Sequence, residues 1–187
     1  MVTLANLWLP IVVATVGVFV ASSLVHMLFK WHNSDYQKLP DEDAVRGVIG
    51  KLPAGQYTIP HCIDTKLMQA PEMRQKFTDG PVAMLMVRPC GMPNMGAHLG
   101  QWFGLCAMIS VITAYMAAHT VPWGVSFLAV CRMTGGCAFL AHGAGAFTNA
   151  IWMGRPGRSA MKDVLDATIY ATVTAVSFGA FWPGPTG

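Results

Sequence analysis

Long apolar stretches separated by short charged ones dominate this chain, and the alternation predicts membrane-spanning helices. Residues 1–29, 89–131, 133–154 and 167–187 contain no Lys, Arg, Asp or Glu. Because about 20 consecutive apolar residues suffice for a helix to cross a bilayer, we expect four spans, at roughly 5–29, 98–119, 125–152 and 163–182. Charged residues make up only 11% of the chain, against about 25% in soluble domains, which agrees with this interpretation.

A cleaved signal peptide is the alternative interpretation of the first stretch. Such peptides carry a basic segment ahead of a shorter apolar core. No Lys or Arg precedes Lys30, and the apolar stretch exceeds the length of that core. We therefore expect residues 1–29 to form a transmembrane helix.

The charged segment 30–97 predicts a small α/β cap between the first and second spans. Helices are expected after Leu39-Pro40 and over 70–77, because Pro and acidic residues favour the first turn of a helix. Short strands are expected over 56–59 and 82–87. The predicted fold is therefore an all-α membrane protein with a cap too small for a core of its own, divided into 1–29, 30–97 and a three-helix region 98–187.

The basic residues predict how the chain is oriented. The connection over 119–124 has no Lys or Arg, whereas the connection before the fourth span carries Arg155, Arg158 and Lys162. Since basic residues beside spans stay cytoplasmic, we expect segments 30–97 and 153–162 in the cytoplasm and both termini in the periplasm. The expected location is the bacterial inner membrane, cytoplasmic or intracytoplasmic.

Small residues recur every four positions in the third and fourth spans. One series is Cys137, Ala141 and Gly145, and the other is Ala167, Ala171, Ala175 and Gly179. Small residues let helix backbones approach closely in lipid. We expect these series to pack the two spans together or against a helix of another protein, although a general abundance of Ala and Gly is an alternative explanation.

Arg132 is a charged residue inside the third span. On insertion scales such a group costs at least about 2.5 kcal/mol at the centre of a membrane helix, so it needs a partner or water. One interpretation is a contact with a ligand, a lipid phosphate or another subunit. The alternative is that its side chain extends to the periplasmic surface.

His142 and Asp166 are the other predicted intramembrane polar contacts. A neutral imidazole at His142 is a weak candidate ligand for a metal or a tetrapyrrole, with Ala138 leaving room for a flat ring. A hydrogen bond between helices is the more frequent role for such a histidine. Asp166 is expected to reach His142 or Asn149, or simply to be an acid in the first turns of its helix.

Sequence patterns typical of catalysis, metal binding and nucleic-acid binding are weak or absent. The pair His61-Cys62 with Cys90 and His98 lacks the usual spacing of zinc ligands, and His26 and His119 lie near span ends. The five cysteines and thirteen methionines are expected to act as apolar packing residues. No GxSxG, HExxH, P-loop or dinucleotide motif occurs. The net charge of +3 without a basic run disfavours nucleic acid. We expect no catalytic residue, no metal site and no enzyme activity.

Four strings resemble those of a family of small bacterial four-span membrane proteins. They are Trp31-His-Asn-Ser-Asp-Tyr36, Leu39-Pro-Asp-Glu-Asp-Ala44, Gly80-Pro81 and Ile151-Trp-Met-Gly-Arg-Pro156. A member of this kind also resembles the accessory membrane subunit of the reaction-centre–light-harvesting photosystem of phototrophic gemmatimonads. The resemblance implies a scaffold subunit, with no active-site residue to carry over.

We therefore expect a non-catalytic accessory subunit that stabilises a larger membrane complex, with membrane-protein subunits and lipids as partners. No cofactor of its own is expected, and contact with bacteriochlorophyll, carotenoid or lipid of a partner is consistent with the resemblance. One alternative is a small redox protein that handles haem or quinone through His142, Arg132 and Asp166. The other is a small transporter.

Overall fold

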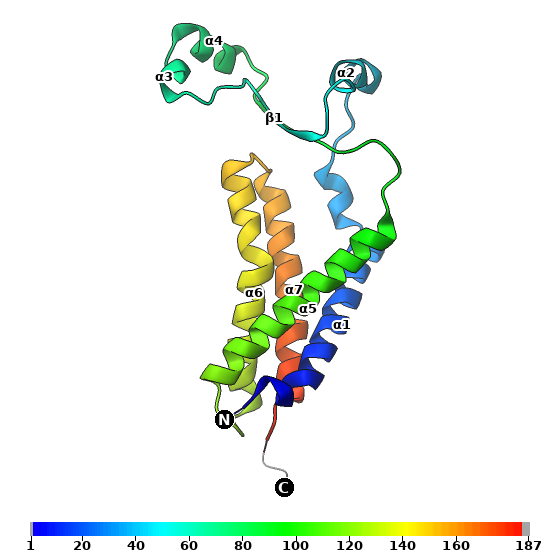
Figure 1. The fold of residues 1–187 in the computed structure, drawn as a ribbon, viewed down its shortest axis with the longest axis vertical. Coiled ribbons are helices and arrows are strands. Elements are labelled where there is room, and N and C mark those ends of the chain that lie inside the picture. The colour runs from blue at the N-terminus through cyan, green and yellow to red at the C-terminus, as the bar shows by residue number, and fades with distance from the viewer. Residues whose placement is uncertain (1, 185–187) are drawn as a thin grey trace. The chain divides into compact units, whose positions relative to one another are not determined.

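The computed structural model describes residues 2–184 and divides them into two compact units. The first unit comprises residues up to Tyr36 and from Asn94 onward, and the second comprises Gln37–Pro93. The first unit is helical (Figure 1). Its elements are η1 (Leu4–Leu7), α1 (Trp8–Leu24), the π-helical turn η2 (Val25–Phe29), the 3-10 helix η3 (Trp31–Asp35), α5 (Met95–Thr120), α6 (Phe127–Trp152) and α7 (Gly157–Ala180).

Among the described residues, three helical segments are long and apolar enough to cross a membrane. They are Leu4–Phe29, Met95–Thr120 and Phe127–Trp152, and they coincide with the first three predicted spans. The fourth predicted span, 163–182, overlaps α7 (Gly157–Ala180), a single helix that is not among the three. Asp163 and Asp166 lie in its first half, and these acids lower its apolar character.

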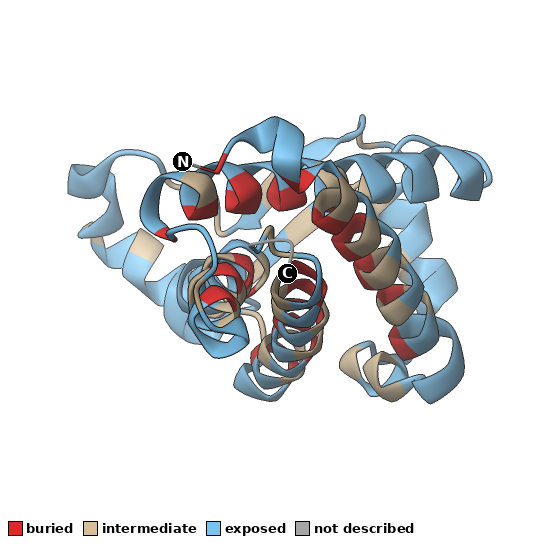
Figure 2. Cartoon of the chain, turned by 90° about the horizontal axis from the view of Figure 1, so that it is seen from below, coloured by how far each residue is buried: buried red, intermediate tan, exposed pale blue. Residues whose placement is uncertain are grey.

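Helices α6 and α7 lie side by side and antiparallel, and α1 and α5 complete the unit (Figure 1). Figure 2 shows that buried residues occupy the helix faces turned toward one another. Phe178 of α7, Ala14 of α1, Ala114 of α5 and Val130 of α6 belong to one buried apolar cluster. The outward faces expose large apolar side chains such as Leu140, as lipid-facing surfaces require.

The small residues of α7 pack against α6, as the sequence predicted. A Cβ added at Gly135 would lie 3.1 Å from the Cβ of Ala175, and one added at Gly143 would lie 3.1 Å from the Cβ of Ala167. The Cys131 thiol also donates a hydrogen bond to the carbonyl oxygen of Ala175 at 3.2 Å. Close approach of the two backbones therefore depends on glycine in α6 and alanine in α7.

Of the two predicted uses of Cys137, Ala141 and Gly145, packing against α7 is not found. Ala141 and Gly145 are exposed and Cys137 is only half-buried. Glycine and alanine are so frequent in α6 that spacing alone does not distinguish one helical stripe from its neighbour. The other predicted use of this stripe, contact with a helix of another protein, stays a prediction.

Gln37–Pro93 form the second unit, which has both helices and strands as predicted. It contains α2 (Glu42–Ile49), β1 (Gly55–Ile59), α3 (Thr65–Met68), α4 (Pro71–Asp79) and β2 (Ala83–Val87). The strands pair antiparallel, with Gly55 opposite Val87 and Ile59 opposite Ala83. None of residues 37–93 is buried, which agrees with a unit that lacks a core of its own. Residues 30–36 and 94–97, expected in this cap, belong to the helical unit.

The contact between α6 and α7 predicts that two glycines only two positions apart respond differently to the same substitution. Gly143→Leu should lower the thermal midpoint of the detergent-solubilised chain, because its side chain meets Ala167; overpacking typically costs about 1–3 kcal/mol. Gly145→Leu is the matched control, since an added Cβ there meets nothing within 4 Å. Equal midpoints for the two variants would contradict this packing.

Candidate functional site

Polar side chains from α5, α6 and α7 and from the turns after α1 gather near one end of the helical unit. A cavity of about 240 Å³ lies among them, lined in part by His26, Trp102, His142, Asp166 and Tyr170. Two of the three predicted intramembrane polar residues, His142 and Asp166, therefore line the same cavity, and Arg132 does not.

The Asp35 carboxylate is the most completely bonded group of this cluster. Its Oδ1 accepts hydrogen bonds from Lys162 Nζ at 2.6 Å and from Ser159 Oγ at 3.0 Å. Its Oδ2 lies 2.7 Å from His32 Nδ1. The hydrogen bond from Lys162, supported by those from His32 and Ser159, holds the pKa of Asp35 well below its usual range despite burial. Asp35 thereby ties η3 to the first turns of α7.

Lys162 extends the same attachment. Its ammonium group also donates to the carbonyl oxygen of Trp31 at 2.7 Å and to Ser34 Oγ at 2.8 Å. Three oxygen acceptors in η3 thus satisfy the three donors of one lysine. Nearby, the two terminal guanidinium nitrogens of Arg155, Nη1 and Nη2, donate to the Asp163 carboxylate.

His32 bridges two carboxylates. Its Nδ1 faces Asp35, and its Nε2 lies 2.8 Å from Asp166 Oδ2. Burial lowers the pKa of His32, but the hydrogen bonds and negative charges of Asp35 and Asp166 outweigh that effect, so the pKa is raised overall. The imidazole consequently joins the segment after α1 to the interior of α7.

Asp166 is buried and only partly bonded. Its side chain is 7% exposed, and its Oδ1 has no hydrogen-bond partner among the described residues. His26 Nε2 lies 3.8 Å from Asp166 Oδ2 and 3.5 Å from the hydroxyl oxygen of Tyr170. An unbonded buried carboxylate oxygen is costly, so this position calls for a further ligand or proton donor.

The structure corrects the predicted partner of Asp166. We expected His142 or Asn149, but the hydrogen-bonded partner is His32. The His142 ring instead lies beside two aromatic rings, with centroids 5.3 Å from Tyr170 and 6.1 Å from Trp102.

A tetrapyrrole at His142 fits this geometry poorly. Ala138, expected to leave room for a flat ring, is fully buried in the protein. The adjoining cavity of about 240 Å³ is smaller than the pockets of roughly 300–1,000 Å³ that hold small molecules and cofactors. His142 therefore acts as a wall of the cavity.

Arg132 lies apart, on the outer surface of α6. Its side chain is exposed and lines a surface hollow of about 440 Å³ together with Val121, Ala129 and Met133. It makes no hydrogen bond or ion pair with any residue in 2–184. The structure thus leaves this cation without a partner inside the described chain.

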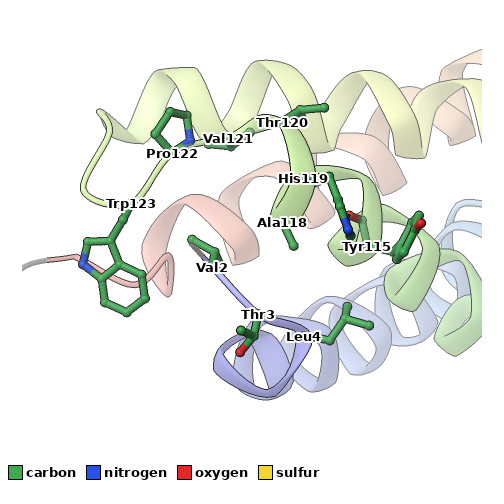
Figure 3. Close-up of a pocket in the computed structure, with 10 residues that line it drawn as sticks. All are labelled: Val2, Thr3, Leu4, Tyr115, Ala118, His119, Thr120, Val121, Pro122 and Trp123. Carbon is green, nitrogen blue, oxygen red and sulfur yellow. The ribbon is translucent and has the colours of Figure 1, made fainter.

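A further hollow, of about 650 Å³, lies where the residues before α1 approach the end of α5 (Figure 3). Its walls are mainly apolar and include Val2, Leu4, Ala118 and Val121. His119 Nδ1 is already bonded to the carbonyl oxygen of Tyr115 at 2.7 Å. Such a surface suits contact with lipid tails or apolar side chains better than it suits catalysis.

Potential metal ligands gather at one place in residues 2–184. His26, His32 and Asp166 each offer a ligand atom, and these atoms all lie within 4.8 Å of one another. The weaker sequence candidates, His61-Cys62 with Cys90 and His98, are not part of this group. Cys62 instead donates a hydrogen bond to the carbonyl oxygen of Asp64 at 3.3 Å.

The sequence analysis missed the contribution of η3. A signal was present, because His32 and Asp35 are three residues apart, as are Ser159 and Lys162, with Asp166 one turn further on the same helix. Such spacing places polar groups on one face of each helical segment. The spacing does not show that these two segments, more than 120 residues apart in the chain, pair with each other.

Comparison with known proteins assigns no family to this chain: no family model, curated protein or solved structure matches it significantly. The resemblance described from the sequence therefore stays a prediction.

The Asp35 cluster predicts a large stability effect from a single lysine. Lys162→Met should destabilise the purified chain by about 3 kcal/mol, because it leaves Asp35, 4% exposed, without its cation. Arg158→Met is the matched control, since Arg158 is exposed on the same helix. Thermal unfolding in detergent measures both; a Lys162→Met midpoint equal to that of the control would refute a structural role for the cluster.

Proposed function

We propose that this chain is a non-catalytic accessory subunit that stabilises a larger complex in a bacterial inner membrane. The observation that carries the proposal is Arg132, an exposed cation within an apolar helix and without a partner in residues 2–184. A charge in such a helix is stabilised by water, by lipid headgroups or by a polar group of another chain. A partner subunit supplies that group most directly.

The uncovered small residues of α6 support the same proposal. Ala141 and Gly145 are exposed because α7 packs on a neighbouring stripe. Helices associate in lipid mainly where small residues permit close backbone contact. An exposed stripe of this kind allows close packing by a helix of another subunit, whereas contact with lipid tails does not require small residues.

We further propose that α7 is the fourth span. Its 24 residues correspond to about 36 Å of helix, enough for a hydrocarbon core of about 30 Å. It lies antiparallel to α6 along its length (Figure 1), and its acids are held by protein groups at one end. The basic residues then favour a cytoplasmic segment 37–93 and periplasmic termini.

The complex that we propose as the partner is a photosynthetic reaction-centre–light-harvesting complex. This step rests on the sequence resemblance alone. Contact with bacteriochlorophyll, carotenoid or lipid would then come from neighbouring subunits. The polar cluster of α7 and η3 would stabilise the fold of this subunit.

Arg132 provides the sharpest test of the accessory role. Arg132→Leu should reduce co-purification with other membrane subunits from native membranes at least about tenfold, as expected for an interaction worth about 1.4 kcal/mol or more. Thermal unfolding of the isolated chain should change little, because Arg132 has no internal partner. Arg158→Leu serves as the control for loss of a positive charge. Unchanged co-purification with Arg132→Leu, or an equal loss of folding, would overturn the proposal.

The proposed topology has its own test. Reporter fusions after Gly91 should report a cytoplasmic position, and fusions after Trp123 a periplasmic one. Alkaline phosphatase activity and green fluorescent protein fluorescence give opposite signals at the two sites. The reverse pattern at both sites would invert the orientation, and the same pattern at both would exclude α5 as a span.

A further inference from the structure

The geometry points to a binding site for a divalent first-row transition metal ion of the Zn²⁺ type, formed by His26, His32 and Asp166. The site is independent of the proposed accessory role, since either can be correct without the other. Two imidazoles and one carboxylate form a donor set that suits Zn²⁺ and Fe²⁺ and does not favour Mg²⁺ or Ca²⁺.

The distances fit this donor set after small movements. Ligand atoms around a tetrahedral Zn²⁺ are separated by roughly 3.3 Å, given metal–ligand bonds of about 2.0–2.1 Å. His32 Nε2 lies 2.8 Å and His26 Nε2 lies 3.8 Å from Asp166 Oδ2. The His26 side chain is 51% exposed, so one side of the ring borders open space into which it can shift.

The unbonded oxygen of Asp166 is the second, independent observation. Its Oδ1 is buried without a hydrogen-bond partner among the described residues, although the side chain lines a cavity. A metal ion bound to this carboxylate would satisfy the oxygen that no described donor reaches. His32 Nε2 and Asp166 Oδ2 are at hydrogen-bond distance, 2.8 Å, and metal binding would displace any proton held between them.

The charge around the site also favours a cation. Two carboxylates, Asp35 and Asp166, face one ammonium group, that of Lys162, which is bonded to Asp35 Oδ1 at 2.6 Å. With neutral imidazoles the group carries a net negative charge. A divalent ion would reverse this imbalance within a partly buried region, where electrostatic attraction is strong.

The surroundings of His32 match those of a metal-binding histidine. Such histidines commonly bond their second ring nitrogen to a carboxylate, which fixes the ring and its tautomer. His32 Nδ1 lies 2.7 Å from Asp35 Oδ2, and Ser159 and Lys162 hold that carboxylate in place. His32 is thus oriented with Nε2 toward Asp166.

The backbone carries His26 in an unusual conformation. His26 lies in the π-helical turn Val25–Phe29, which ends at Lys30 with a φ of 52°. Turns of this type are rare and recur at functional sites. Here the turn precedes η3, so His26 and His32 reach the same carboxylate from one short segment.

The cavity leaves room for a fourth ligand. His26 and Asp166 line its wall together with Tyr170, whose hydroxyl oxygen lies 3.5 Å from His26 Nε2. Three protein ligands with one open position are typical of sites that bind water or a small molecule at the metal. We therefore expect water, or a small anionic or neutral ligand, as the fourth ligand.

Metal titration of the full-length chain in detergent tests this site. After removal of metals with a chelator, Zn²⁺ content measured by mass spectrometry should reach about one ion per chain, and Co²⁺ should give the visible absorption of four-coordinate sites. His26→Gln and Asp166→Asn should each weaken Zn²⁺ binding about tenfold or more. Asp35→Asn, which weakens both the support of His32 and the pairing with Lys162, should weaken it about 10- to 100-fold.

His119→Gln is the matched control, because His119 is an exposed histidine bonded to a carbonyl oxygen near the end of α5. It should leave binding unchanged. Since His26 is half exposed, His26→Gln should also keep the thermal midpoint of the metal-free chain. Failure to bind Zn²⁺ or Co²⁺ stoichiometrically would overturn the proposal, as would unchanged binding in both His26→Gln and Asp166→Asn. The cluster would then have a structural role only.

Discussion

The helical unit depends on the ion pair between Asp35 and Lys162, because it connects the segment after α1 to the first turns of α7. The carboxylate is almost fully buried and has three hydrogen-bond partners. His32 lies within η3, and Ser159 and Lys162 belong to α7. A buried charge is tolerated only when paired and fully bonded. The attachment therefore fixes η3 against α7, and with it the positions of His32 and, through the preceding turn, His26.

Hydropathy was sufficient to predict the long helices, but not how they contact one another. The first three spans agree with the structure to within a few residues, and the strands 56–59 and 82–87 were also found in the second unit. Lipid selects long apolar helices so strongly that their presence follows from composition. By contrast, the face of α6 that meets α7 depends on Gly135 and Gly143, and several stripes of small residues in α6 have similar spacing.

The candidate site was predicted only in part, for a related reason. Asp166 and His142 attracted attention because they are polar residues in apolar surroundings, and both line the cavity. His32 and Asp35 lie in a short polar segment where polar residues are ordinary, so their three-residue spacing was the only signal and did not show which segment they meet. Their role appears only when segments distant in the chain are brought together.

The polar character of α7 and its central position have a common physical explanation. Of the long helices it contains the most buried polar groups, including Asp166, Ser159 and Thr174, and it contacts both α1 and α6 (Figure 1). Polar side chains in apolar surroundings are stable when other helices shield and bond them. The helix with the weakest apolar character is thus the one that most requires neighbours, and α1 and α6 supply them. The same shielding creates the enclosed, negatively charged position at Asp166 where a metal ion would be held.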